Sequence, residues 1–441
     1  MSKKNRSSVK TALSFHDLRN QAQQCTFRER VGHFSRFIAQ MQASREHYYL
    51  REIVSPPGRV VDLIDPQTGR KRTFRMFGSN NYLGLANHPS VCEAMRRAVA
   101  NYGAGVSGPP LLNGYTRLHR ELEERLSAFK QAEDTLIFPT GYAANTGLIT
   151  ALTTPRDLVC YDELSHASLC DGLKLARATA QSFRHNDLHQ LRQLLEDPAH
   201  AAAGDRFVGV EGVYSMDGDL APLDRMVPLC RKHRAILILD DAHGSGVMGA
   251  SGRGTAEHFG MEGQIDITMG TFSKTFGVVG GFVSADKAVI DYLRYFARSY
   301  MFSASLPPAV IAAVLAGLEV IAREPERREQ LQRNVRYLAD GLERLGLPVH
   351  PEAAIIALRV PRGMNIRAAA GRFHQAGIFL NAIEYPAVPL DEQRFRISVM
   401  ADHTREDLDQ LLETVGKVWG NFENGELRNG TNSDCGLRIA D

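Results

Sequence analysis

The middle of the chain alternates short, uninterrupted hydrophobic runs with longer segments of helical periodicity. The runs cover residues 135–138, 158–161, 207–210 and 235–239. A strand buried on both faces of a parallel sheet has this pattern, because neither face meets water. The helical segments between the runs fit right-handed crossover connections. The pattern therefore predicts an α/β domain between about residues 80 and 300.

The two flanks of this region have a different pattern. Alternating apolar positions from 60 to 77 surround a turn sequence at 65–69 and predict a hairpin. After Pro307 and Pro308, one long helical pattern reaches about residue 345 and is followed by two expected strands and a closing helix, at 354–358, 395–399 and 404–420. These elements predict a smaller α+β domain.

The pattern divides the chain into five parts. We expect an N-terminal arm with a helix that leads to Tyr48, a first part of the small domain, a large domain, the C-terminal small domain and a flexible tail. Their predicted ranges are 1–50, 51–79, 80–305, 306–420 and 421–441.

Composition excludes several classes of protein. Lys and Arg total 52 and Asp and Glu total 50, so the net charge of +2 argues against a protein built to hold nucleic acid or an anionic membrane. No apolar run is long enough to span a bilayer, and none follows the basic start as in a signal peptide. The six cysteines form no CxxC pair, so we expect no metal site and a cytoplasmic location.

Two polar clusters of the large domain contain residues that could bind a ligand. Asp240 and His243 come directly after the run 235–239, where ligands of open α/β sheets bind. Lys274 stands with Thr271 and Ser273 between two apolar segments, as a lysine does that forms a Schiff base with an aldehyde. Each cluster alone has a simpler interpretation, namely a capping aspartate and a solvated loop lysine.

Three further clusters could hold parts of the same ligand. Thr140, Gly141 and Tyr142 lie between a strand and a helix, where free N–H groups bind anions. His166 could stack on a planar cofactor, although a single histidine is more often structural. In the expected strand at 395–399 and the residue before it, Arg394, Arg396 and Ser398 share the polar face, where an arginine could bind a carboxylate or simply lie exposed at an edge.

Taken together, these groups describe one ligand. A lysine for an aldehyde, an aspartate for a pyridinium, a helix terminus for a phosphate, a histidine for the ring and an arginine for an amino-acid carboxylate indicate a site for pyridoxal phosphate. Spacing alone leaves the reaction open between transamination and other chemistry at the Cα atom.

The sequence also resembles the α-oxoamine synthases, pyridoxal phosphate-dependent acyltransferases that include 8-amino-7-oxononanoate synthase, 2-amino-3-ketobutyrate coenzyme A ligase and serine palmitoyltransferase. The resemblance runs in order from about residue 49 to about residue 419. It is carried by the motifs SNNYLGL, GVYSMDGD, DDAHG and TFSK, at 79–85, 212–219, 240–244 and 271–274.

The resemblance implies a fold-type I enzyme with a mostly parallel sheet in the large domain, and a homodimer with its sites at the interface. It implies condensation of glycine, alanine or serine with an acyl thioester on coenzyme A or on an acyl carrier protein, usually with loss of carbon dioxide, to give an α-amino ketone. The alternatives are another fold-type I enzyme, an aminotransferase or a lyase, and a non-catalytic partner subunit.

Roles for single residues also follow from the resemblance. Lys274 would be the Schiff-base residue, Asp240 the partner of the ring nitrogen and His166 the stacking side chain, with His243 near the ring hydroxyl. The remaining expected contacts are Thr140, Gly141, Tyr142, Ser215, Thr271 and Ser303 for the cofactor, Ser303 coming from the other subunit, and Asn80 and Arg396 for the substrate carboxylate.

The chain departs from the family pattern at one place near the expected site. Pro109 and Pro110 replace a hydroxylated residue and an arginine that usually follow the glycine-rich turn. In the family the hydroxylated position lies close to the amino-acid side chain, so this departure bears on the choice among glycine, alanine and serine.

Overall fold

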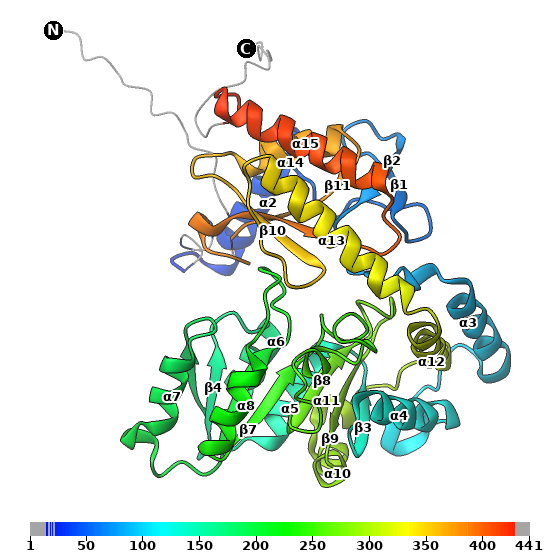
Figure 1. Cartoon of the computed structure of the whole chain (residues 1–441), viewed down its shortest axis with the longest axis vertical. Coiled ribbons are helices and arrows are strands. Elements are labelled where there is room, and N and C mark those ends of the chain that lie inside the picture. Colours follow the sequence, from blue (N-terminus) through cyan, green and yellow to red (C-terminus); the bar gives the residue numbers. More distant parts are fainter. Residues whose placement is uncertain (1–14, 16–17, 19, 21–22, 386, 428–441) are drawn as a thin grey trace.

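A seven-stranded sheet forms the centre of the large domain in the computed structural model, which describes residues 15, 18, 20, 23–385 and 387–427 (Figure 1). The strand order is β3-β9-β8-β7-β6-β4-β5. The strands are β3 (Asp134–Phe138), β4 (Leu158–Asp162), β5 (Thr179–Phe183), β6 (Arg206–Glu211), β7 (Ala235–Asp240), β8 (Ile267–Thr271) and β9 (Gly281–Ala285). The strands from β8 to β5 are parallel and β9 is antiparallel to both neighbours, so the prediction of a mostly parallel sheet is confirmed.

Helices cover both faces of this sheet, which explains the continuous hydrophobic runs. One face carries α5 (Gly141–Leu152), α6 (Ala167–Ala176), α10 (Lys287–Phe296) and α11 (Arg298–Met301), and the other carries α7 (Leu188–Glu196) and α8 (Leu223–Lys232). Along β7, Ile238 packs into the first layer, whereas Leu237 and Leu239 pack into the second. Neither set of side chains meets water, so both must be apolar.

The small domain contains two three-stranded sheets. The first has the order β1-β2-β11, with β1 (Val60–Ile64), β2 (Lys71–Met76) and β11 (Ile378–Phe379), and the predicted hairpin is its antiparallel β1–β2 pair. The second has the order β10-β13-β12, with β10 (Ile355–Arg359), β12 (Asn381–Ile383) and β13 (Arg394–Ser398). The helices α13 (Glu326–Arg344), α14 (Ile366–Gln375) and α15 (Arg405–Glu423) pack against these sheets (Figure 1).

The remaining elements connect or flank the two domains. They are α2 (Phe27–Ala43), α3 (Pro89–Tyr102), α4 (Arg117–Lys130), α9 (Thr255–His258), α12 (Pro308–Arg323) and the short turns η1 (Leu85–Asn87), η2 (Pro110–Gly114), η3 (Pro198–His200) and η4 (Leu390–Glu392). The helix expected in the N-terminal arm is α2. It begins with a capping box, in which Thr26 and Glu29 each satisfy a backbone N–H of the other.

The structure corrects three predictions about elements. The single helix expected up to residue 345 is two helices, α12 and α13, because Pro325 lies between them and has no N–H to continue a helical ladder. The closing helix α15 runs to Glu423, across the boundary at which we expected the tail to start. Strands β5, β8 and β9 were not predicted. Residues 428–441 of the expected tail and residues 1–14, 16–17, 19 and 21–22 of the N-terminal arm lie outside the described residues.

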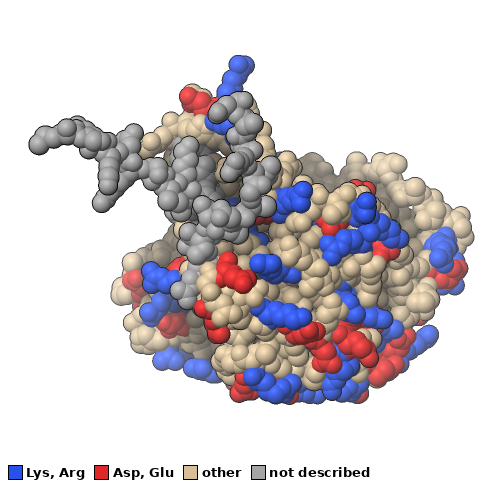
Figure 2. Space-filling view, turned by 90° about the horizontal axis from the view of Figure 1, so that it is seen from above, with Lys and Arg blue, Asp and Glu red and all other residues tan. Residues whose placement is uncertain are grey.

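Charged side chains of both signs are interspersed on the face seen in Figure 2. In the part of the chain that the structure describes, no helix is long and apolar enough to cross a membrane.

Candidate active site

The carboxyl ends of four neighbouring strands bring polar side chains to one edge of the large sheet. Strands β4, β6, β7 and β8 end in Asp162, Glu211, Asp240 and Thr271. The Cα atoms of Glu211 and Asp240 are direct partners in the parallel ladder. This edge is where open α/β sheets bind their ligands.

Asp240 is held in a fixed orientation by neutral donors. The Asn145 side-chain amide donates to its Oδ2 at 2.7 Å, and the backbone N–H of Ala242 donates to its Oδ1 at 3.1 Å. The same amide of Asn145 donates to the Ser168 hydroxyl at 2.9 Å. That hydroxyl oxygen lies 2.8 Å from Nδ1 of His166. A buried chain of hydrogen bonds therefore joins two predicted site residues, Asp240 and His166.

Lys274 lies in the loop after β8, among charges of both signs. Burial lowers the pKa of its amine to about 8, although Asp240 and Glu211 favour the charged form; Arg396 adds to the lowering. A lysine with a pKa near 8 is neutral in a substantial fraction of molecules at physiological pH. That neutral amine is the form that attacks an aldehyde.

Glu211 is a site residue that the sequence analysis missed. Burial, and after it the charge of Asp240, raises the pKa of this carboxyl to about 8. Its Oε2 accepts the N–H of Ser215 at 3.2 Å, whereas its Oε1 is buried without a partner among the described residues. The signal was present, because Glu211 ends a hydrophobic run in the same way as Asp240.

An anion cradle lies between the start of α5 and the end of β8. Thr140 caps the helix by accepting the N–H of Ala143 at 2.9 Å, which leaves the N–H groups of Gly141 and Tyr142 without helical acceptors. A Cβ atom on Gly141 would lie only 2.9 Å from that of Thr271, so only glycine lets the helix end approach this strand so closely. The hydroxyls of Thr271 and Ser273 are 3.0 Å apart.

Asn80 and Arg396 meet across the small domain. Nη2 of Arg396 donates to Oδ1 of Asn80 at 2.6 Å, and Nε of Arg396 is buried without a partner among the described residues. The hydroxyl of Tyr82 donates to the same Asn80 oxygen at 3.3 Å and lies 2.7 Å from Nδ1 of His243. The fully buried Tyr82, which the sequence analysis did not single out, therefore connects the Arg396–Asn80 pair with His243.

Both histidines of the site favour the neutral form. Burial, reinforced by the charges of Lys274 and Arg396, holds the pKa of His243 well below its usual value. Burial also lowers the pKa of His166, although the nearby Asp240 acts in the opposite direction.

Two other residues do not join this cluster as simply as expected. The Tyr142 hydroxyl donates to Asp171 on α6, and its ring is 46% exposed. Ser303 lies two residues after Met301, the last residue of α11. Ser303 was expected to serve the other subunit, so a single chain does not test its role.

Arg394 is a correction to the interpretation of β13. The strand is the middle one of its sheet and Arg394 is only 1% exposed, so the alternative of an exposed edge arginine is wrong. Its guanidinium pairs with Asp217 and with Glu392, the latter at 2.9 Å. Arg394 therefore anchors the loop after β6 to the small domain.

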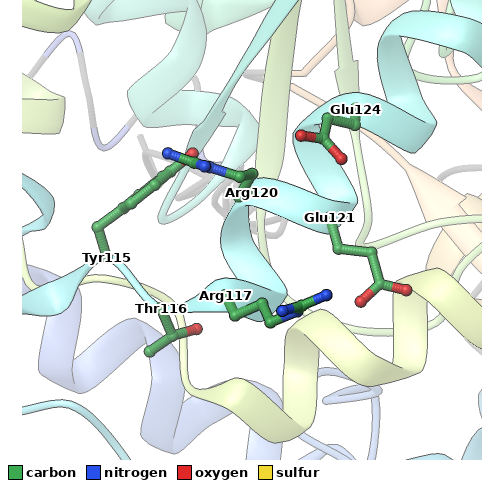
Figure 3. A pocket seen from close by; sticks show the side chains of 6 residues that line it. All are labelled: Tyr115, Thr116, Arg117, Arg120, Glu121 and Glu124. Carbon is green, nitrogen blue, oxygen red and sulfur yellow. The ribbon is translucent and has the colours of Figure 1, made fainter.

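A wide cavity of about 560 Å³ lies at the start of α4, away from these residues. Figure 3 shows the guanidinium of Arg120 beside the ring of Tyr115, with Arg117 and Glu121 on the next face of the helix. None of the side chains that line it belongs to the predicted site.

Comparisons with known proteins identify the family. The model for aminotransferase class I and II matches residues 74–415. The chain is 42% identical over 395 residues to 8-amino-7-oxononanoate synthase of Geobacter metallireducens, covering 88% of this chain and 98% of that protein. It is also 42% identical over 345 residues to serine palmitoyltransferase of Bacteriovorax stolpii, covering 78% and 82%. The chain belongs to the α-oxoamine synthase family.

The fold of this α-oxoamine synthase agrees with that of solved relatives. The structure of serine palmitoyltransferase from Sphingomonas wittichii superposes with a TM-score of 0.82 at 33% identity, covering 89% of this chain and 97% of that one. The fold-type I prediction is thereby confirmed, and the cofactor of the family is pyridoxal phosphate.

The residues present in this synthase fit that cofactor. The amine of Lys274 suits its aldehyde and the fixed carboxylate of Asp240 suits its ring nitrogen. The α5 terminus beside Thr271 suits its phosphate. Buried polar atoms without partners, such as Glu211 Oε1, are what a site built for a polar ligand leaves open.

Proposed function

We propose that this synthase condenses a small amino acid with an acyl thioester, usually with loss of carbon dioxide, and releases an α-amino ketone. The observation that carries the proposal is the buried Arg396–Asn80 pair, which lies within electrostatic reach of Lys274. A guanidinium there binds the amino-acid carboxylate while the Cα atom lies next to the amine. The relatives named above belong to the same family, and this membership favours a thioester as the second substrate.

The bound cofactor supplies an electron sink that stabilises negative charge at Cα. Asp240, held in place by the donors from Asn145 and Ala242, would hold a proton on the ring nitrogen. His166 would cover one face of the cofactor ring. Lys274 takes the Cα proton, which its pKa of about 8 allows near neutral pH. The neutral His243, hydrogen-bonded to Tyr82, holds its position near the ring hydroxyl.

Binding of the phosphate falls to the cradle of Thr140, Gly141, Tyr142 and Thr271. Ser215, whose N–H donates to Glu211 at 3.2 Å, would supply a further contact to the cofactor.

A second copy of the chain completes the site in this proposal, through Ser303. Two large apolar side chains next to that segment, Leu112 and Phe302, are 80% and 71% exposed. The N–H of Ser305 donates to the carbonyl of Gly108 at 3.1 Å, so both exposed loops form one surface. Light scattering should give the mass of a dimer. A monomer that is fully active would contradict this part.

The reaction is tested with a matrix of substrates. Glycine, alanine and serine are each combined with acyl-coenzyme A and with acyl carrier protein thioesters of several chain lengths. Free thiol and product mass are the readouts, and Lys274→Ala is the inactive control. Thiol release with an α-amino ketone supports the proposal, whereas a keto acid without thiol release would show an aminotransferase.

The same matrix decides two open questions. Substituting Pro109 by serine and Pro110 by arginine tests whether the proline pair, which begins η2, sets the choice of amino acid. Fractionation of the producing cells tests the predicted cytoplasmic location.

A further inference from the structure

A second cavity lies in the small domain, where the segment after α2 crosses the edge of the β10-β13-β12 sheet. Its volume is about 160 Å³. The apolar part of its wall comes from Phe373, Ile378, Leu380 and Phe395. A cavity of about 150 Å³ with apolar walls holds one benzene molecule, so this space suits a single ring or a short branched chain.

Arg51 brings an unneutralised positive charge to this cavity. One of its Nη atoms donates to the carbonyl of Leu380 at 3.2 Å, and its guanidinium carbon lies 3.3 Å from the centre of the Phe379 ring. Its Nε is buried without a partner among the described residues, and no described ion pair involves it. Burial lowers the pKa of Arg51 to about 10, which reflects the same lack of an acidic partner.

Two other charges of the lining, Arg367 and Glu384, already pair with each other. Glu384 accepts two hydrogen bonds from Arg367, at 2.9 and 3.2 Å, and one from the Tyr49 hydroxyl at 2.8 Å. Glu46 also lines the cavity; its carboxylate accepts from the Ser44 hydroxyl at 3.4 Å, a contact on the exposed side, and makes no described ion pair with Arg51. Arg51 is therefore the positive charge of the lining that an anionic ligand could neutralise.

The back wall of this cavity contains residues next to Arg396, the arginine proposed to bind the substrate carboxylate. Asn381, which lines the cavity, is the strand partner of Arg396, and its side chain donates to the carbonyl of Gly78 at 3.0 Å. Gly78 lies two residues before Asn80. The lining residue Phe395 precedes Arg396 on β13. A ligand in the cavity would thus contact β13, which carries Arg396, and Asn381, which is hydrogen-bonded to the segment that carries Asn80.

We propose that this cavity is an effector site for a small carboxylic acid with a compact apolar body, separate from the catalytic site. The carboxylate pairs with Arg51 and the apolar body fills the space against Phe373 and Phe395. Occupancy changes the affinity for the amino acid through Asn381 and Gly78. Only this last step rests on the proposed function.

Benzoate is a suitable probe, because it combines one ring with one carboxylate, and benzamide is its neutral counterpart. Calorimetric titration into the holoenzyme gives the dissociation constant without any turnover. We expect benzamide to bind at least about tenfold more weakly, since a charge-assisted hydrogen bond contributes about 1.5–3 kcal/mol and 1.4 kcal/mol is tenfold.

Three variants locate the site. Arg51→Gln removes the charge and Ala370→Leu fills the space, and each should weaken benzoate binding at least about tenfold. Arg97→Gln, an exposed arginine on α3, is the matched control and should bind as the parent does. If Arg51→Gln does not fold, Ala370→Leu decides alone.

Further titrations separate this cavity from the catalytic site. Benzoate should still bind to Arg396→Ala and in the presence of saturating thioester. Unchanged binding in Ala370→Leu, loss of binding in Arg396→Ala, or displacement by the thioester would each overturn the proposal. With the effector site confirmed, an amino-acid dissociation constant that does not respond to benzoate would refute the coupling alone.

Discussion

Replacing Arg396 by alanine tests the proposed carboxylate contact most directly. The side chain is only 8% exposed, donates to Asn80 at 2.6 Å and has a second buried nitrogen, Nε, without a partner. Removing one member of a buried, charge-assisted pair costs about 2–5 kcal/mol. Because 1.4 kcal/mol is a factor of ten, the amino-acid dissociation constant should rise between about 30-fold and several-thousand-fold.

The assay is a titration of amino acid into each holoenzyme variant, followed by the absorbance change of the bound cofactor. Saturation by the thioester and cofactor content should stay near those of the parent. Arg396→Lys should rescue little, because a compact ammonium cannot copy a two-pronged guanidinium contact. The charge of Arg396 also lowers the pKa of Lys274, so its removal should move that pKa upwards.

The choice of control follows from the structure. Arg394 shares the strand, but it is buried and paired with Asp217 and Glu392, so its removal should destabilise the fold. Arg359 is better suited, since its side chain is 66% exposed on the neighbouring strand β10. Equal amino-acid affinity in Arg396→Ala and the parent, or an equal loss in Arg359→Ala, would refute the assignment.

Three further predictions concern the charged groups of the large domain. Lys274→Ala should abolish turnover but leave the fold intact. In the parent apoprotein, the rate of cofactor binding should rise with pH around 8, because the Lys274 amine loses its proton there. Borohydride labelling of a different lysine would contradict the assignment. Asp240→Asn should raise the activation barrier for Cα proton exchange by about 3 kcal/mol while cofactor content stays high. A near-normal exchange rate would show that the charge of Asp240 is unimportant. Burial alone would lower the pKa of His185, but contacts with Asp162 and Asp219 at 3.1 and 2.6 Å raise it to about 10. The stability that these contacts contribute is fully present below about pH 6.5 and is lost as the pH rises through about 10. The melting temperature of His185→Gln should therefore fall less than that of the parent between these two pH values.

Much of the large domain follows from the sequence because its signals are local. A run of apolar residues such as 235–239 is a buried strand wherever the rest of the chain lies, and the polar residue after it must stand at the sheet edge. Asp240 was therefore found by its position along the chain, whereas Lys274 was found by its small hydroxylated neighbours, Thr271 and Ser273. Glu211 also follows a hydrophobic run directly, but it was missed because a glutamate after a strand does not by itself indicate a contact that pyridoxal phosphate needs.

Other features depend on contacts between residues far apart in the chain. The pairing of Arg396 with Asn80, the bridge from Tyr82 to His243 and the burial of Arg394 all require the small domain to close on segments from both ends of the chain. Period-two alternation places Arg394 and Arg396 on one face of β13, but it does not predict which residues that face contacts. Only the tertiary structure decides that one arginine is locked in ion pairs while the other keeps a free nitrogen, because burial and partners are properties of the packed surfaces rather than of the strand.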